Sequence, residues 1–173
     1  MTTARVVSSP EAVRLRNALK ELSRLRNLEV RIGWFSSAKY EDGTPVAYVA
    51  AIQEFGYAPK HIVARMGLRG EMIPKKQKDW AEFLERSARM ILAGEWHVRD
   101  ALEAMGSRVA ADVQKQIASV KEPLLAIPTL EARARRRGLE HWTDLSATGQ
   151  KPLSDTGLMH ASVTYMIADG RSE

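Results

Sequence analysis

The chain has 173 residues, of which 45% are hydrophobic and 27% are charged, and lysine and arginine outnumber aspartate and glutamate by 26 to 21. These are the values of a globular chain that is long enough to bury a core, and they exclude wholesale disorder. The absence of cysteine excludes a disulfide framework and thiolate chemistry.

The same numbers predict how the chain is organised. From the length of the chain we expect one domain over residues 1–173. We also expect no membrane partner, because no apolar run reaches the roughly 18 residues of a membrane span. The N-terminus lacks the apolar segment of a signal peptide, so we expect a protein made and kept in a cytoplasm unless a particle carries it out. The net charge of +5 permits contact with nucleic acid or an acidic protein surface but requires neither.

The first part of the chain predicts two helices around one strand. A serine–proline pair begins a helix over 9–26, and alternating apolar residues predict a half-buried strand over 28–34. A threonine–proline pair begins a second helix over 46–55, and Gly56 ends it with a left-handed conformation. Residues 61–66 are apolar enough to be a further strand.

The middle of the chain predicts two longer helices. One covers 75–93 and ends at Gly94, and the other begins near residue 95 and ends near residue 120. The second carries the clearest helical stripe in the chain, which consists of Val98, Leu102, Met105, Val109, Val113, Ile117 and Val120. Gly106 lies within this helix and indicates close packing or a slight bend.

The last part of the chain predicts two short helices and a second strand. We expect a short helix that carries residues 131–138, a loop over 139–151, and a short helix at 158–161 that leads directly into a strand over 163–167. Residues 168–173 should be a frayed tail. Taken together, these elements predict an α+β fold with a small, mostly antiparallel sheet packed by several helices.

No catalytic signature emerges from the sequence. Ser154, Asp155 and His160 lie close together without a nucleophile elbow, whereas the members of a catalytic triad converge from separate elements. The four histidines occur singly, without the spacing of metal ligands, and no glycine-rich phosphate loop is present. We therefore expect no enzymatic activity, no metal and no cofactor.

An arginine-rich segment within residues 121–151 is the strongest remaining chemical feature. Its four guanidinium groups in five residues can hold phosphates or carboxylates through paired hydrogen bonds. The alternative is a solvated helix, with Glu131 and Glu140 as partial counter-charges. The candidate contacts to protein or DNA are Arg133, Arg135, Arg136, Arg137, Lys75 and Lys76.

Three separated blocks of sequence resemble one known family. The blocks are Val30–Trp34 with Tyr40–Pro45, then Val46–Gly56, then Lys151–Tyr165. In this order and spacing they resemble the tail-completion or neck proteins of tailed bacteriophages, a group that includes the minor tail protein Z type and the Mu-like virion morphogenesis proteins. The most specific matches are Glu54, Phe55, Gly56, Asp155, Thr156, Gly157 and Ser162.

The resemblance implies a structural protein of the virion, located in the tail or neck and assembled in the cytoplasm of the bacterial host. It implies a ring at the head-proximal end of the tail, with six copies favoured over a match to a twelve-fold connector. The partners that it implies are further copies of the chain, a head-closure or connector protein, a tail terminator or tail-tube protein, and genomic DNA in the lumen.

Two alternatives to this function stay open from the sequence. One is a cytoplasmic nucleic-acid-binding protein that uses Arg133–Arg137 and the basic first helix. The other is an assembly chaperone that is absent from the mature particle.

Overall fold

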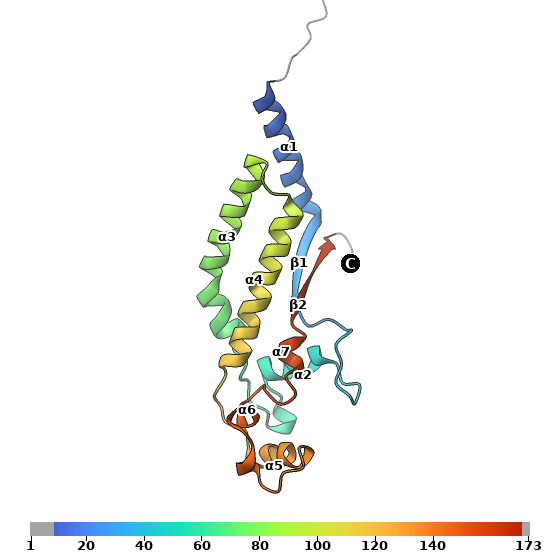
Figure 1. Cartoon of the computed structure of the whole chain (residues 1–173), viewed down its shortest axis with the longest axis vertical. Coiled ribbons are helices and arrows are strands. Elements are labelled where there is room, and N and C mark those ends of the chain that lie inside the picture. Colours follow the sequence, from blue (N-terminus) through green and yellow to red (C-terminus); the bar gives the residue numbers. More distant parts are fainter. Residues whose placement is uncertain (1–8, 171–173) are drawn as a thin grey trace, which may run out of the picture. The chain divides into compact units, whose positions relative to one another are not determined.

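The structure is a computed structural model that describes residues 9–170. Within these residues the chain forms seven α-helices and one antiparallel sheet of two strands, so the predicted α+β fold class is confirmed (Figure 1). The described residues group into two compact units. Unit 1 consists of residues 9–31, 77–108 and 165–170, and unit 2 consists of residues 32–76 and 109–164.

Unit 1 begins with the predicted N-terminal helix. In α1 (Pro10–Arg24), the Ser9 hydroxyl accepts a hydrogen bond from the backbone N–H of Ala12 at 3.2 Å, which caps the helix start. A 3₁₀ turn then leads into strand β1 (Leu28–Gly33), as the alternating pattern predicts.

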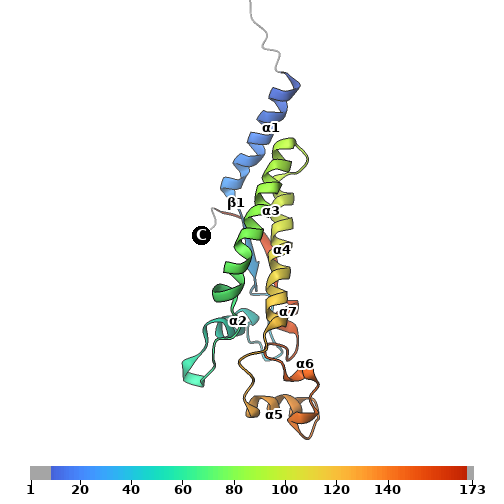
Figure 2. The same ribbon diagram turned by 90° about the vertical axis from the view of Figure 1, so that its left-hand side faces the viewer.

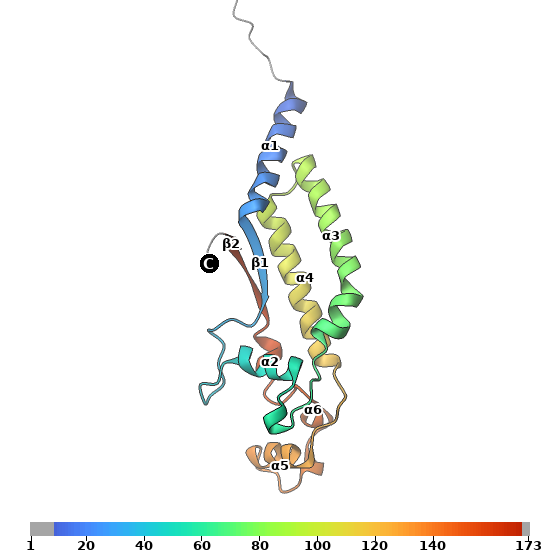
Figure 3. The ribbon, with the colours of Figure 1, turned by 180° about the vertical axis from the view of Figure 1, so that it is seen from behind.

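Strand β2 (Thr164–Asp169) pairs with β1 (Figure 3). The predicted frayed tail is therefore wrong for its first residues. Ala168 and Asp169 belong to the strand, and the backbone N–H of Gly170 donates to the carbonyl oxygen of Asn27 at 2.8 Å. Residues 171–173 lie outside the described part of the chain.

The core of unit 1 lies between its strands and two long helices, α3 (Ile73–Ala93) and α4 (Val98–Ser119), whose parts in this unit run side by side (Figure 1). The turn between them contains Gly94 with a φ of 77°, which confirms the predicted break. The buried residues of this core are Ile91, Val98, Ala101 and Leu102, and the half-buried apolar residues against them are Leu22, Leu28, Val30, Trp96 and Ile167.

The predicted stripe is confirmed, because all of its members are buried; six of them lie on α4, and Val120 follows directly after the helix. The close packing that Gly106 indicates is also present. A Cβ atom at this position would lie 2.5 Å from the ring of Tyr165 on β2, so only glycine lets this strand approach the helix so closely.

Unit 2 contains four shorter helices, which are α2 (Val46–Phe55), α5 (Ile127–Arg136), α6 (Ala147–Gln150) and α7 (Leu158–Ala161). Figure 2 shows α5 and α6 beside each other. Leu130 and Ala134 of α5 form a small core together with Leu145. Leu125, Leu139 and Trp142 pack around this core.

Two predictions for unit 2 are wrong. Residues 61–66 form no strand, because the backbone N–H groups of Arg65 and Met66 both donate to the carbonyl oxygen of Gln53 at the end of α2. An isolated bridge between Tyr57 and Ile62 is the only sheet-like pairing that involves residues 57–66. The predicted loop over 139–151 contains a 3₁₀ turn (Trp142–Asp144) as well as α6, whose start is capped by the Ser146 hydroxyl.

Every helix of the described residues is too short or too polar to cross a membrane.

Candidate functional site: an arginine cluster around Asp155

Helix α5 places its arginines on two different faces. Leu130, Arg133 and Ala134 are buried, because their spacing puts them on the side that packs into unit 2. Arg135 and Arg136 are exposed, and Arg137 follows directly after the last helical residue. The four arginines of the predicted contact segment therefore do not form one continuous exposed surface.

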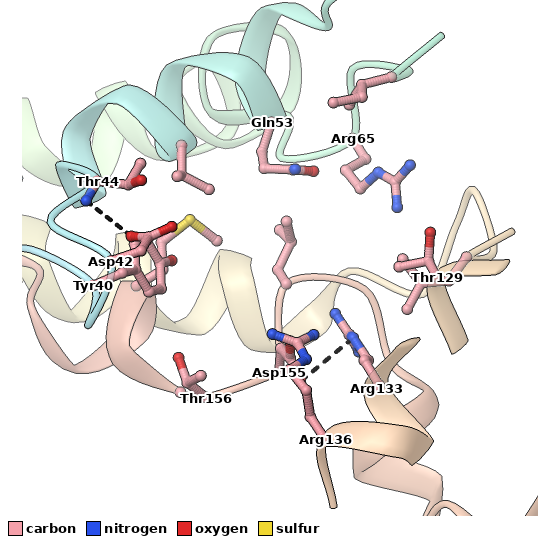
Figure 4. A pocket seen from close by; sticks show the side chains of 16 residues that line it. Tyr40, Asp42, Thr44, Gln53, Arg65, Thr129, Arg133, Arg136, Asp155 and Thr156 are labelled. Atoms are coloured by element: carbon pink, nitrogen blue, oxygen red, sulfur yellow. Dashed lines mark hydrogen bonds and ion pairs between the residues drawn. The ribbon is translucent and has the colours of Figure 1, made fainter. Parts of the chain in front are cut away.

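Three of these arginines converge on the carboxylate of Asp155, and Figure 4 shows two of them, Arg133 and Arg136. Arg136 Nη2 lies 2.5 Å from Asp155 Oδ2. Arg133 Nε and Arg137 Nη2 each lie 3.6 Å from Asp155 Oδ1, and Arg137 also donates to the backbone carbonyl of Asp155 at 2.8 Å. The counter-charge of the cluster is thus a residue about twenty positions further along the chain.

Arg133 is the most enclosed member of the cluster, with 6% of its surface exposed. Its Nη1 donates to the carbonyl oxygens of Gly149 at 2.9 Å and Lys151 at 2.8 Å, which ties α5 to the end of α6. Its Nε is buried and has no hydrogen-bond partner in the structure. Burial lowers the pKa of Arg133, and only the charge of Asp155 acts against that shift. The Asp155 carboxylate therefore offsets only part of the cost of burying the positive charge of Arg133.

A cavity of about 390 Å³ opens beside this cluster. Its walls come from the loop before α2, from α2 itself, from residues 62–65, from α5 and from the segment that leads into α7. Figure 4 shows the side chains of Arg65 and Arg133 on two sides of this space. Burial lowers the pKa of Arg65 as well.

The other lining residues divide into an apolar wall and a polar rim. The apolar wall consists of Val49, Ile62, Leu125, Leu153 and Met159. On the polar side, burial raises the pKa of Tyr40, with Asp155 and Asp42 adding to the shift, so its phenol stays neutral. The Asp42 carboxylate lies at the exposed rim and accepts a hydrogen bond from the backbone N–H of Thr44 at 2.9 Å, which lowers the pKa of Asp42.

The remaining candidate contacts lie outside this cavity. Arg135 is exposed and does not line it. Lys75 pairs with Glu71 at 3.5 Å within one helical turn, and Lys76 lies 3.8 Å from Asp112. The structure therefore brings three of the six predicted contact residues together.

The first group of family-motif residues ends α2. The Glu54 carboxylate accepts hydrogen bonds from the backbone N–H groups of Leu68 at 2.9 Å and Arg69 at 2.8 Å. Phe55 is 65% exposed, and the Arg69 guanidinium lies over its ring at 5.8 Å. Gly56 has a φ of 79°, and a Cβ atom there would lie 2.9 Å from the carbonyl oxygen of Ile62. This close approach requires glycine.

The second group of family-motif residues surrounds α7. The Thr156 hydroxyl accepts a hydrogen bond from the backbone N–H of Leu158 at 3.2 Å, and Gly157 adopts a φ of 75° just before the helix. The Ser162 hydroxyl donates to the carbonyl oxygen of Leu158 at 2.6 Å. Asp155 forms ion pairs with arginines of the same chain. Thr156, Gly157 and Ser162 shape the backbone at the two ends of α7.

Sequence reasoning missed two parts of the cavity. Arg65 lies in an apolar segment without any motif, so nothing marked it as a partner of the arginine-rich helix. Gln53 lines the same cavity, and its Oε1 is buried without a hydrogen-bond partner. The sequence marks Asp155 as a motif residue and as a member of the rejected Ser154–Asp155–His160 triad, but not as a partner of the arginines, because these contacts depend on tertiary structure.

Comparison with known protein families, with curated proteins and with solved structures gave no match. Within residues 9–170, the structure brings no group of three metal-ligating side chains together.

Proposed function

We propose that this chain is a structural subunit of a tailed-bacteriophage virion, which forms a ring at the head-proximal end of the tail. In this role it joins the tail to a head-closure or connector protein and surrounds the DNA passage. The observation that carries the proposal is that the three blocks of sequence resembling neck proteins pack against one another.

The contacts between these blocks are specific. The indole Nε1 of Trp34, at the end of the first block, donates to the carbonyl oxygen of Met159 in the third block at 2.7 Å. Helix α2, which is the second block, packs against α7 of the third block. Strand β1, which contains residues 30–33 of the first block, pairs with β2, which contains Thr164 and Tyr165 of the third block. Three segments that are far apart in the sequence are thus in contact in the folded chain. Such contacts are expected if these segments form the structural framework of a protein family.

The exposed apolar surface of the chain favours a subunit that binds further copies. Leu15 and Leu19 are more than half exposed on one face of α1, and Tyr48 and Phe55 are likewise exposed on α2. Exposed apolar side chains of this kind are available for contacts with another subunit, where they would be removed from water. A closed ring needs two different surfaces on each subunit, and the two sets of residues belong to different units of the chain.

The ion pairs between the arginines and the motif residue Asp155 favour a structural role over binding to nucleic acid. Arg133, Arg136 and Arg137 contact Asp155, so their charges are partly used inside the protein. A protein that binds DNA through this segment would instead be expected to present these cations to phosphates.

Mass spectrometry of purified particles tests the proposal. We expect the chain in mature particles at a fixed ratio to the connector protein, consistent with a ring. Its absence from mature particles, together with its presence in assembly intermediates, would contradict the proposal and favour an assembly chaperone.

A further inference from the structure

The cavity beside Asp155 carries an excess of positive charge that the chain does not neutralise. Arg65, Arg133 and Arg136 line it, and Arg137, which does not line it, contacts the Asp155 carboxylate as well. The Asp155 carboxylate has two oxygens and serves three guanidinium groups. Asp42 is the other acid that lines the cavity, and it lies at the exposed rim, where it is held by Thr44.

Two of these arginines are incompletely paired within the fold. Arg133 is buried and lines the cavity, and its Nε lies 3.6 Å from Asp155 Oδ1, beyond hydrogen-bond distance (Figure 4). Arg65 makes one long hydrogen bond, from Nε to the carbonyl oxygen of Val63 at 3.4 Å. Within the described residues, Arg65 forms no ion pair with a carboxylate. A buried cation without full compensation is costly, and an anion placed between these two groups would remove that cost.

We propose that this cavity binds a single carboxylate, the side chain of an aspartate or glutamate on a partner protein. The planar fork of Arg65 matches the geometry of a carboxylate held by paired hydrogen bonds, and Arg133 adds a fixed positive charge beside it. The Thr129 hydroxyl points into the same space and provides a further donor (Figure 4). This inference does not depend on the function proposed above.

The walls of the cavity favour a protein carboxylate over a nucleic-acid phosphate. One wall is apolar, and Leu125, Ile62 and Val49 can contact the aliphatic stem of an acidic side chain. A volume of about 390 Å³ accommodates a side chain and its neighbouring peptide groups, but not a duplex. A nucleic-acid strand would also bring flanking phosphates to the rim, where Asp42 would repel them.

A titration of the full chain with glutarate tests this inference. The Nε–H signals of Arg65 and Arg133 in ¹⁵N-labelled protein are followed at neutral pH. We expect both signals to shift saturably, because one of the two carboxylates of glutarate binds between these groups and its aliphatic chain contacts the apolar wall. The absence of a saturable shift would overturn the proposal.

Two matched variants locate the binding. Arg65→Met keeps the aliphatic part of the side chain and removes the charge, and we expect it to weaken glutarate binding at least tenfold. Arg135→Met makes the same change on an exposed residue outside the cavity, and we expect unchanged binding. Arg65→Lys should lie between them, because it keeps the charge and loses the fork. Equal affinity of Arg65→Met and the unaltered protein would overturn the assignment.

A parallel titration with inorganic phosphate decides between the two kinds of anion. We expect phosphate to bind more weakly than glutarate, because it cannot use the apolar wall. Tighter binding of phosphate that is lost in Arg65→Met would overturn the choice of a carboxylate and assign a phosphate group to the site.

Discussion

Trp34 and Met159 are 125 positions apart in the chain, and the indole Nε1 of Trp34 donates a hydrogen bond to the carbonyl oxygen of Met159 at 2.7 Å. This bond joins the residue after β1 to helix α7. The bond links the first and third of the sequence blocks that resemble neck proteins. Its removal therefore tests directly how much this contact stabilises the packing of these blocks.

Replacement of Trp34 by phenylalanine removes this donor. We expect a loss of about 1 kcal/mol in the free energy of unfolding beyond the effect of the smaller ring, measured by urea denaturation. Trp96→Phe is the matched control, since Trp96 is also half-buried and its indole makes no hydrogen bond within the described residues. Equal losses in the two variants would show that the bond to Met159 contributes nothing.

Replacement of Gly106 by alanine tests the packing of β2 on α4. The added methyl group would lie 2.5 Å from the Tyr165 ring, so we expect a loss of about 1–3 kcal/mol in the free energy of unfolding, despite the higher helix propensity of alanine. Gly70→Ala is the control, because a Cβ atom there meets no atom within 4 Å. Unchanged stability of Gly106→Ala would contradict this contact.

Replacement of Asp155 by asparagine leaves three arginines without their shared carboxylate. We expect a loss of about 2 kcal/mol in the free energy of unfolding, which is less than for a fully enclosed ion pair because the Asp155 side chain is 27% exposed. Sulfate should restore part of the stability of this variant by supplying an anion. Glu140→Gln, a change at an exposed acid three residues after Arg137, should leave stability unchanged, and an equal loss there would count against a special role of Asp155.

Replacement of Leu19 by glutamate tests the proposed subunit contact of α1. Leu19 is 55% exposed, so we expect an unchanged backbone amide spectrum and unchanged stability. Incorporation of the variant into particles should fall at least tenfold, measured by mass spectrometry after complementation of a deletion. Arg16→Glu, a charge change on the same helix, is the control, and normal incorporation of Leu19→Glu would exclude this face as a subunit contact.

Local signals predicted most of the helices and both strands. The cap at Ser9, the break at Gly94 and the stripe of α4 depend on residues close in sequence, and each is present in the structure. The strand expected at 61–66 is absent because Arg65 and Met66 donate to Gln53, a contact that only the folded chain creates. The partners of Asp155 were unpredictable for the same reason, since they come from a helix about twenty positions earlier.

The proposed role at the head–tail joint is tested most directly by deleting the gene and imaging the resulting particles by electron microscopy. We predict separate, DNA-filled heads and unattached tails, with joining restored when the intact chain is supplied. Intact, infectious particles assembled without the chain would contradict this function.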